Sequence, residues 1–195
     1  MVQRLRLVLA SSSIYRRELL NRLGLPFIIR IPNIDETEID GEIPQDMAVR
    51  LALAKAKKVA SKEQNATVIS SDQVAISGGK ILRKPGSKER AVATLTFLSG
   101  REVCFLTALV VLNTVTGKTH QHLDETHVQF RKLEQSEIRH YVATEEPLDC
   151  AAAVKSEGMG ITLLERISTQ DPTALIGLPL IRLSKFLRAE GFSFD

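Results

Sequence analysis

Hydrophobic and polar positions along this chain follow two periods, one typical of helices and one typical of strands. Apolar residues spaced three or four apart predict helices, and short β-branched or alternating runs predict strands. The predicted helices cover residues 14–23, 44–61, 87–98, 136–143 and 179–189. The predicted strands cover residues 2–10, 27–31, 66–70, 74–76, 80–82, 102–113, 119–130 and 160–164.

The order of these elements predicts an α/β fold. Strand–helix units occupy the first part of the chain, and hairpins are interspersed among the later elements. This mixture favours a mixed, twisted and elongated sheet flanked by helices. A length of 195 residues fits a single domain over residues 1–195, with two lobes around a cleft.

Composition narrows the class of protein. The chain is 44% apolar and 25% charged, which is typical of globular proteins, and its net charge of +3 is too small to indicate a nucleic-acid partner. The apolar block at residues 105–112 is too short to span a membrane, and the opening residues do not resemble a secretory signal. The two cysteines form no metal-binding spacing or disulfide framework, so we expect a cytoplasmic protein.

The segment LRLVLASSSIYRR, residues 5–17, predicts an anion-binding turn. A turn of small residues between a strand and a helix exposes backbone N–H groups, and the helix N-terminus adds partial positive charge. Arg16 and Arg17 have the wrong sign for the first turn of a helix unless an anion neutralises them. We therefore interpret this turn as a binding site for polyphosphate.

Acidic side chains in two other segments are candidates for chemistry. Asp72 follows the predicted strand at residues 66–70, where strand ends of α/β sheets meet the ligand crevice, although an Asp can also simply turn a strand into a hairpin. Asp35 and Glu36 lie in an acidic loop that is most simply solvated. Alternatively, one of them joins Asp72 in holding Mg²⁺, which takes one or two protein carboxylates with phosphate oxygens and water.

Two lysines could complete a phosphate site. Lys55 lies among alanines and leucines in a predicted helix, from which its ammonium group could simply extend to the surface. Lys84, beside Pro85, could equally be a loop lysine. Together with Arg16 and Arg17, they supply the positive charge that a triphosphate requires.

The histidines raise the possibility of a zinc site. His120, His122 and Asp124 alternate along a predicted strand, and His127 lies beyond them. The polar face of an exposed antiparallel strand explains the same pattern more simply. The patterns typical of P-loop, Rossmann, α/β-hydrolase and HExxH proteins do not occur in the sequence.

Several motifs together resemble a known family. The runs LASSSIYRRELL, IDETE, RLALAKAKKVA, SDQV, RKP, KSEGMGITLLERI and IGLPL occur in the order found in the Maf-like nucleotide pyrophosphatases, from about Leu5 to Gly191. SDQV and KSEG resemble the branch that hydrolyses 7-methyl-GTP. The branch acting on dTTP and UTP has a Thr after the Asp, and Gln-Gly where this chain has Ser156-Glu157-Gly158.

The resemblance implies a fold like that of the inosine triphosphate pyrophosphatases and hydrolysis between the α- and β-phosphates of a nucleotide. It also implies a divalent cation, Mg²⁺ or Mn²⁺, and suggests a homodimer. Asp72 falls on the family's proton-acceptor position. The same resemblance implies that phosphate is bound by Ser11, Arg16, Arg17, Lys55 and Lys84. It implies that the substrate is selected by Tyr15, Gln73 and Glu157, and that the metal is held by Glu36 and Asp72.

The sequence departs from the family pattern at four places. Ile14 replaces a Pro, Ser70 and Arg83 each replace a Gly, and Ala152-Ala153-Val154 replaces a Gly-small-aromatic run. The last departure concerns the base pocket more than the phosphate chemistry. Two alternatives therefore stay open: a dTTP/UTP pyrophosphatase, and a nucleotide-binding regulator of septum formation with weak catalysis.

Overall fold

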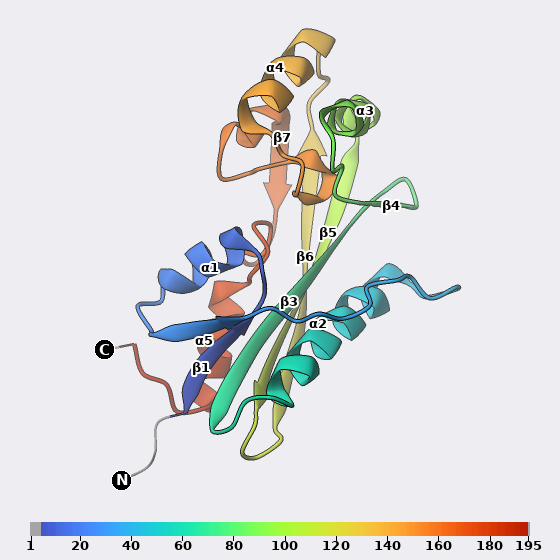
Figure 1. Ribbon diagram of the computed structural model, residues 1–195. Helices are drawn as coiled ribbons and strands as arrows, with labels where there is room; N and C mark the ends of the chain where they lie inside the picture. The colour runs from blue at the N-terminus through green and yellow to red at the C-terminus, as the bar shows by residue number, and fades with distance from the viewer. Residues whose placement is uncertain (1–4, 195) are drawn as a thin grey trace. The chain divides into compact units, whose positions relative to one another are not determined.

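The structure, a computed structural model, describes residues 5–194 (Figure 1). Its strands are β1 (Arg6–Ala10), β2 (Phe27–Arg30), β3 (Ala66–Ser77), β4 (Lys80–Leu82), β5 (Glu102–Asn113), β6 (Thr119–Phe130) and β7 (Leu164–Ser168). Its α-helices are α1 (Ile14–Asn21), α2 (Pro44–Ala60), α3 (Lys88–Leu98), α4 (Gln135–Glu145) and α5 (Leu180–Ala189). Two short 3₁₀ helices, η1 (Ala151–Ala153) and η2 (Met159–Leu163), precede β7.

The strands form a mixed sheet. Within the described residues the strand order is β2-β1-β3-β5-β6-β7, and β4 pairs with β3. β1 runs parallel to β2 and to β3, whereas β4 is antiparallel to β3 and β7 is antiparallel to β6. The predicted α/β class with a mixed sheet flanked by helices is confirmed.

The chain divides into two compact units. The first contains the described residues up to Asp72, together with Thr107–Asp124 and the residues from Asp171 onward. The second contains Gln73–Leu106 and Glu125–Gln170. Both units include parts of β3, β5 and β6, so the boundary in β3 falls between Asp72 and Gln73.

In the first unit, successive side chains of a strand point to opposite faces of the sheet and contact different helices. Leu9 and Ile69 belong to a buried cluster with the leucines of α1 and α5, and these helices cover one face of β1 and β3 (Figure 1). The neighbouring residue in β3 turns to the opposite face, where the Ser70 hydroxyl donates to the carbonyl of Ala52 in α2 at 2.7 Å. Successive residues of β3 therefore serve different helices.

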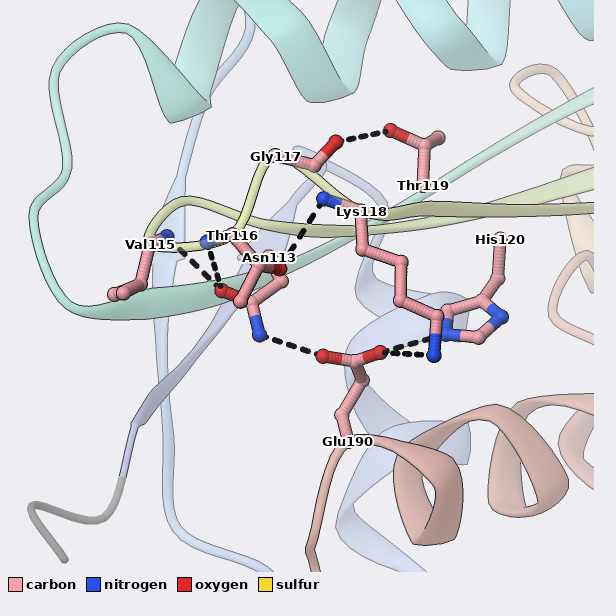
Figure 2. Close-up of polar contacts among 8 residues, drawn as sticks. All are labelled: Asn113, Val115, Thr116, Gly117, Lys118, Thr119, His120 and Glu190. Atoms are coloured by element: carbon pink, nitrogen blue, oxygen red, sulfur yellow. Dashed lines mark hydrogen bonds and ion pairs between the residues drawn. The ribbon is translucent and has the colours of Figure 1, made fainter.

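A buried carboxylate fastens the end of α5 to the β5–β6 hairpin (Figure 2). Glu190 accepts hydrogen bonds from Asn113 Nδ2 and His120 Nε2, both at 2.6 Å, and lies 3.5 Å from Lys118 Nζ. Burial acts to raise the pKa of Glu190. The hydrogen bonds from Asn113 and His120 and the charges of His120 and Lys118 outweigh burial, so the pKa lies below the usual glutamate range.

Helix α4 organises the second unit. It packs against α3, and its buried residues include Ile138 and Tyr141. The Tyr141 hydroxyl donates to Ala153 O at 3.3 Å and accepts from Lys155 N at 2.9 Å. The loop after η1 is thus attached to α4 through a side chain that is fully enclosed, and burial raises the pKa of Tyr141.

Three of the predicted strands differ from the strands that the structure describes. β3 is one strand from Ala66 to Ser77, so the prediction that Asp72 follows a strand end is wrong. The predicted strand at residues 160–164 is also wrong, because Met159–Leu163 form η2 and β7 begins at Leu164. Residues 2–4 of the first predicted strand lie outside the described residues.

In the part of the chain that the structure describes, no helix is both long and apolar enough to cross a membrane.

Candidate functional site

The turn between β1 and α1 is ordered by its own serines. The Ser11 hydroxyl accepts from Ser13 N at 3.1 Å, and the Ser13 hydroxyl accepts from Arg16 N at 3.3 Å, which makes Ser13 the N-cap of α1. Two backbone N–H groups of the predicted anion site are thereby already bonded within the turn. Tyr15 is half-buried and Arg17 is exposed.

Arg16 is held by a glycine carbonyl. Its Nε donates to Gly177 O at 2.8 Å, and the Ser71 hydroxyl donates to the same oxygen, also at 2.8 Å. Gly177 has φ +120°, and a Cβ there would lie 3.4 Å from Arg16 Nε, so glycine suits both the conformation and the close approach. Burial lowers the pKa of Arg16, while the charges of Asp72 and Glu36 oppose that shift.

Lys55 joins the two predicted acidic residues. Its Nζ lies 2.6 Å from Asp72 Oδ1 and 2.7 Å from Glu36 Oε1. The side chains of Lys55 and Asp72 are 9% and 10% exposed, whereas that of Glu36 is 57% exposed. The ammonium group therefore does not extend to solvent from the apolar face of α2. Instead it neutralises a buried carboxylate and a solvated one.

This arrangement explains why β3 carries Asp72 in its interior. Ser70 and Asp72 lie two residues apart and both contact α2, through Ala52 and Lys55 respectively. Ser71, between them, turns the other way and holds Gly177. One stretch of strand thus positions the buried acid on one face and the carbonyl that holds Arg16 on the other.

The acidic loop is fixed by Arg50 of α2. Its guanidinium contacts Glu42 Oε1 at 2.5 Å and Oε2 at 2.6 Å, and donates to Thr37 O at 3.2 Å. Asp35 Oδ1 accepts from Thr37 N at 2.9 Å, and the hydrogen bonds from Thr37 lower the pKa of Asp35. Asp35 therefore shapes the loop that carries Glu36.

The donor set at Lys55 fits a hard divalent cation. Glu36 and Asp72 each place a carboxylate oxygen against the Lys55 ammonium group, at 2.7 and 2.6 Å, so the two oxygens lie near each other beside it. Magnesium and manganese take carboxylate oxygens together with phosphate and water. The predicted pair of metal ligands, Glu36 and Asp72, has the chemistry that such a cation requires.

Three predicted site residues belong to the second unit, and the structure describes each by its own surroundings. Gln73 is half-buried and follows Asp72 in β3, whereas Lys84 and Glu157 are exposed and lie in loops. The first unit brings together Arg16, Glu36, Lys55 and Asp72. The roles of Gln73, Lys84 and Glu157 stay predictions.

The loop that carries Glu157 is closely packed. Glu145 Oε1 accepts from Met159 N at 2.7 Å, and a Cβ at Gly158 would lie 2.6 Å from that same oxygen. A Cβ at Gly160 would lie 2.3 Å from Lys155 O. Glycine is required at position 160, where the close atoms are backbone, whereas at position 158 a larger residue would displace the Glu145 carboxylate from Met159 N.

At residues 152–153, where the sequence departs from the family pattern, the backbone has an unusual conformation. Ala152 and Ala153 adopt left-handed backbone, with φ of 55° and 56°. Glycine adopts this conformation without the cost that a Cβ imposes. The backbone here thus has the conformation that suits the family's glycine, although the chain carries alanine.

The alternating histidines do not form the zinc site considered above. His120 bonds to Glu190 at 2.6 Å and stacks on Phe186, with ring centroids 4.9 Å apart. His122 Nε2 lies 3.8 Å from Asp124 Oδ2, and burial lowers the pKa of His122. These contacts are within the first unit, to which His127 does not belong.

Sequence reasoning missed the residues that hold the site in place. Ser71 and Gly177 hold Arg16, and Arg50 holds the acidic loop. The glycine in IGLPL was the available signal for Gly177. Arg50 gave no signal, because its partners depend on how residues 31–43 fold back toward α2.

Comparison with known proteins places the chain in a family. The model of the Maf-like protein family matches residues 6–190. A 7-methyl-GTP pyrophosphatase of Aromatoleum aromaticum is 51% identical over 95% of this chain and 96% of its own length. A protein of the same name from Xanthomonas campestris pv. campestris is 51% identical over 96% of this chain and 97% of its own.

A solved structure supports the fold. The Ham1 protein of Staphylococcus aureus matches with a TM-score of 0.55 at 16% identity, covering 95% of this chain and 99% of the other. At that identity the likeness concerns the fold alone. With the family model matching nearly the whole chain, the protein belongs to the Maf-like family.

Proposed function

We propose that this chain is a nucleotide pyrophosphatase that cleaves 7-methyl-GTP, or a related modified nucleotide, between its α- and β-phosphates. The observation that carries the proposal is the buried Lys55–Asp72 ion pair, which Glu36 completes from the acidic loop. A structural ion pair needs no second, solvated acid. Curated relatives about half identical to this chain bear the name 7-methyl-GTP pyrophosphatase.

In this mechanism Asp72 handles the attacking water. Its carboxylate orients the water for in-line attack at the α-phosphorus and accepts its proton. Lys55 holds Asp72 in place through the contact at Oδ1. Because phosphoryl transfer depends mainly on positioning and electrostatics, no covalent nucleophile is required.

Positive side chains receive the phosphates. Arg16 donates its Nε–H to Gly177 O, which fixes the orientation of the guanidinium group. The N–H donors on its two terminal nitrogens remain available to phosphate oxygens. Arg17 and, by family resemblance, Ser11 and Lys84 complete the phosphate contacts. Glu36 and Asp72 would hold Mg²⁺ or Mn²⁺, which supplies further neutralisation of phosphate charge when bound.

Base recognition has a physical rationale in the proposed residues. Methylation at N7 gives guanine a positive charge, which favours stacking on the aromatic ring of Tyr15. Glu157 would accept hydrogen bonds from the N1–H and amino edge, strengthened by the opposite charges. Gln73 offers both a donor and an acceptor to the base edge.

A pyrophosphate-release screen tests the proposal. Purified full-length protein is incubated with 7-methyl-GTP, GTP, dTTP or UTP in the presence of Mg²⁺ or Mn²⁺. We expect the largest kcat/KM for 7-methyl-GTP, with the monophosphate as the other product. A preference for dTTP and UTP would assign the chain to the other branch, and nucleotide binding without release would favour a regulator of septum formation.

Two further properties are proposed from the resemblance. A homodimer is expected, and sedimentation equilibrium would contradict it by giving the mass of one chain. A cytoplasmic location is expected for an enzyme of nucleotide metabolism, and cell fractionation would test it.

A further inference from the structure

A separate cluster of metal-ligand side chains lies in the second unit, on β5 and β6. Cys104, Glu125 and His127 each bring one ligand atom within 4.8 Å of the other two. Among residues 5–194, this is the one such group of three His, Cys, Asp or Glu side chains. The hydrolysis proposed above uses none of them.

The register of the hairpin explains the proximity. Phe130 N donates to Arg101 O at 2.9 Å, and Gly100 N donates to Arg131 O at 2.8 Å. Counting along the antiparallel pair from these bonds places Cys104 opposite His127. Cross-strand neighbours of this kind have Cβ atoms about 4.5–5.5 Å apart.

All of the cluster's side chains occupy one face of the two strands. Glu102 and Cys104 are two residues apart in β5, as are Glu125 and His127 in β6. The intervening residues of both strands, Val103 and Thr126, are fully buried. Cys104 and His127 are half-buried and Glu125 is exposed, so the cluster lies on a face that a dissolved ion can reach.

The donor set selects for zinc. A thiolate, an imidazole and a carboxylate are the ligands that Zn²⁺ takes, and magnesium would not favour the sulfur. In a tetrahedral zinc site, bond lengths near 2.0–2.3 Å place ligand atoms about 3.3–3.8 Å apart. Side-chain rotations can close the remaining difference from the observed 4.8 Å limit.

A fourth residue is placed to orient the histidine. Glu102 Oε1 lies 3.2 Å from His127 Nδ1. When Nδ1 donates its proton to this carboxylate, Nε2 carries the lone pair available to a metal. Metal-binding histidines typically have such a carboxylate or carbonyl partner.

We propose that Cys104, Glu125 and His127 bind Zn²⁺, with water in the fourth position and Glu102 as a positioning residue. Three protein ligands leave one coordination position open to an exogenous group. Bound zinc would also cross-link β5 and β6 at this point. This site uses none of the residues assigned to the phosphates or to the catalytic metal.

Cobalt substitution tests the site directly. Metal-free full-length protein is titrated with Co²⁺ under reducing conditions, and absorption is followed in the near-ultraviolet and visible ranges. We expect a thiolate-to-cobalt charge-transfer band that saturates at one Co²⁺ per chain and disappears on addition of Zn²⁺. Absence of that band in the wild-type protein would overturn the proposal.

The variants identify the ligands. Cys104→Ser and His127→Gln should abolish the band, while Cys150→Ser, at the other cysteine, should retain it. Glu102→Gln should weaken zinc binding by about 10–100-fold without removing the band. Loss of the band in Cys150→Ser, or its retention in Cys104→Ser, would contradict the assignment. Circular dichroism checks that each variant is folded, and Asp72→Asn should keep the band whatever its hydrolytic activity.

Discussion

Lys55 is the residue that both predicted acidic side chains of the first unit contact. Its ammonium group contacts a buried aspartate and an exposed glutamate at 2.6 and 2.7 Å. Transfer of a charge out of water costs several kcal/mol. Here the attraction between Lys55 and Asp72 offsets the cost of burying both charges. Removing Lys55 leaves the Asp72 carboxylate buried without this ion pair.

Replacing Lys55 therefore has an effect on stability as well as on activity. We expect Lys55→Met to lower the free energy of unfolding by about 3–5 kcal/mol, the range for breaking a buried pair. Lys58→Met, in the same helix but exposed, should change it by less than about 0.5 kcal/mol. Urea denaturation of the two variants measures the difference, and equal stability would show that the Lys55–Asp72 contact is not stabilising.

At Glu157 the proposal concerns selectivity. Glu157→Gln removes the negative charge proposed to meet the methylated base, so the ratio of kcat/KM for 7-methyl-GTP over GTP should fall by about tenfold, equivalent to roughly 1.4 kcal/mol. Glu134→Gln, an exposed glutamate in the same unit, is the matched control. An unchanged ratio in Glu157→Gln would remove this residue from base recognition.

At the scale of elements, most helices and strands could be predicted because their periodicity is local. β5 and β6 match their predicted bounds, and Ser87 caps α3 as expected of its residue type. β3 was predicted as two strands, residues 66–70 and 74–76, with Asp72 placed between them. In the structure, partners on both faces, Ala52 and Gly177, satisfy the serines within a continuous strand.

The attachment of α5 to the β5–β6 hairpin gives a pH-dependent contribution to stability. Because the folded pKa of Glu190 lies below its unfolded value, its contribution is present above the unfolded pKa of about 4.3 and is lost as pH falls through the folded pKa. Glu190→Gln should cost about 1.5–3 kcal/mol at pH 7, typical of hydrogen bonds to a charged group.

Urea denaturation of wild type and Glu190→Gln across pH 3–7 checks this contribution. The difference between the two proteins should shrink as pH falls through the acidic range. A difference that stays constant with pH would mean that the ionised carboxylate is not the stabilising form.

The C-terminus of α4 carries conformational strain. Glu146 has φ of 45° and is exposed, and its carboxylate forms an ion pair with Lys88. A left-handed non-glycine residue costs roughly 1–2 kcal/mol, whereas an exposed ion pair contributes about 0–1 kcal/mol. Glu146→Gly should therefore raise the unfolding free energy by about 1 kcal/mol.

Thermal or urea denaturation checks this sign, with Arg139→Gly as a control because Arg139 is exposed within α4, where the backbone is ordinary helix. The control should show no gain. A destabilised Glu146→Gly variant would show that the ion pair with Lys88 outweighs the backbone cost.

For the whole molecule, sequence reasoning selected candidate site residues but not the surroundings that the fold gives them. The burial of Lys55 could not be predicted, because a lysine on an apolar helix face usually reaches solvent and its partners come from segments 17 and 19 residues away. Asp72 was identified for a reason that proved wrong, a strand end, yet lies in contact with Lys55. Arg50 and Ser71 were missed because only the folded chain brings them to their partners.

The central claim is that Asp72 acts on the attacking water, and Asp72→Asn tests it most directly. Asparagine keeps the shape of the side chain but cannot accept the proton, whereas Asp46→Asn, exposed in the first turn of α2, is the matched control. We measure pyrophosphate release from 7-methyl-GTP and, by calorimetry, nucleotide binding. The account predicts that Asp72→Asn loses at least about 100-fold in kcat while binding persists, and that the control is unaffected. Undiminished pyrophosphate release by Asp72→Asn would contradict it.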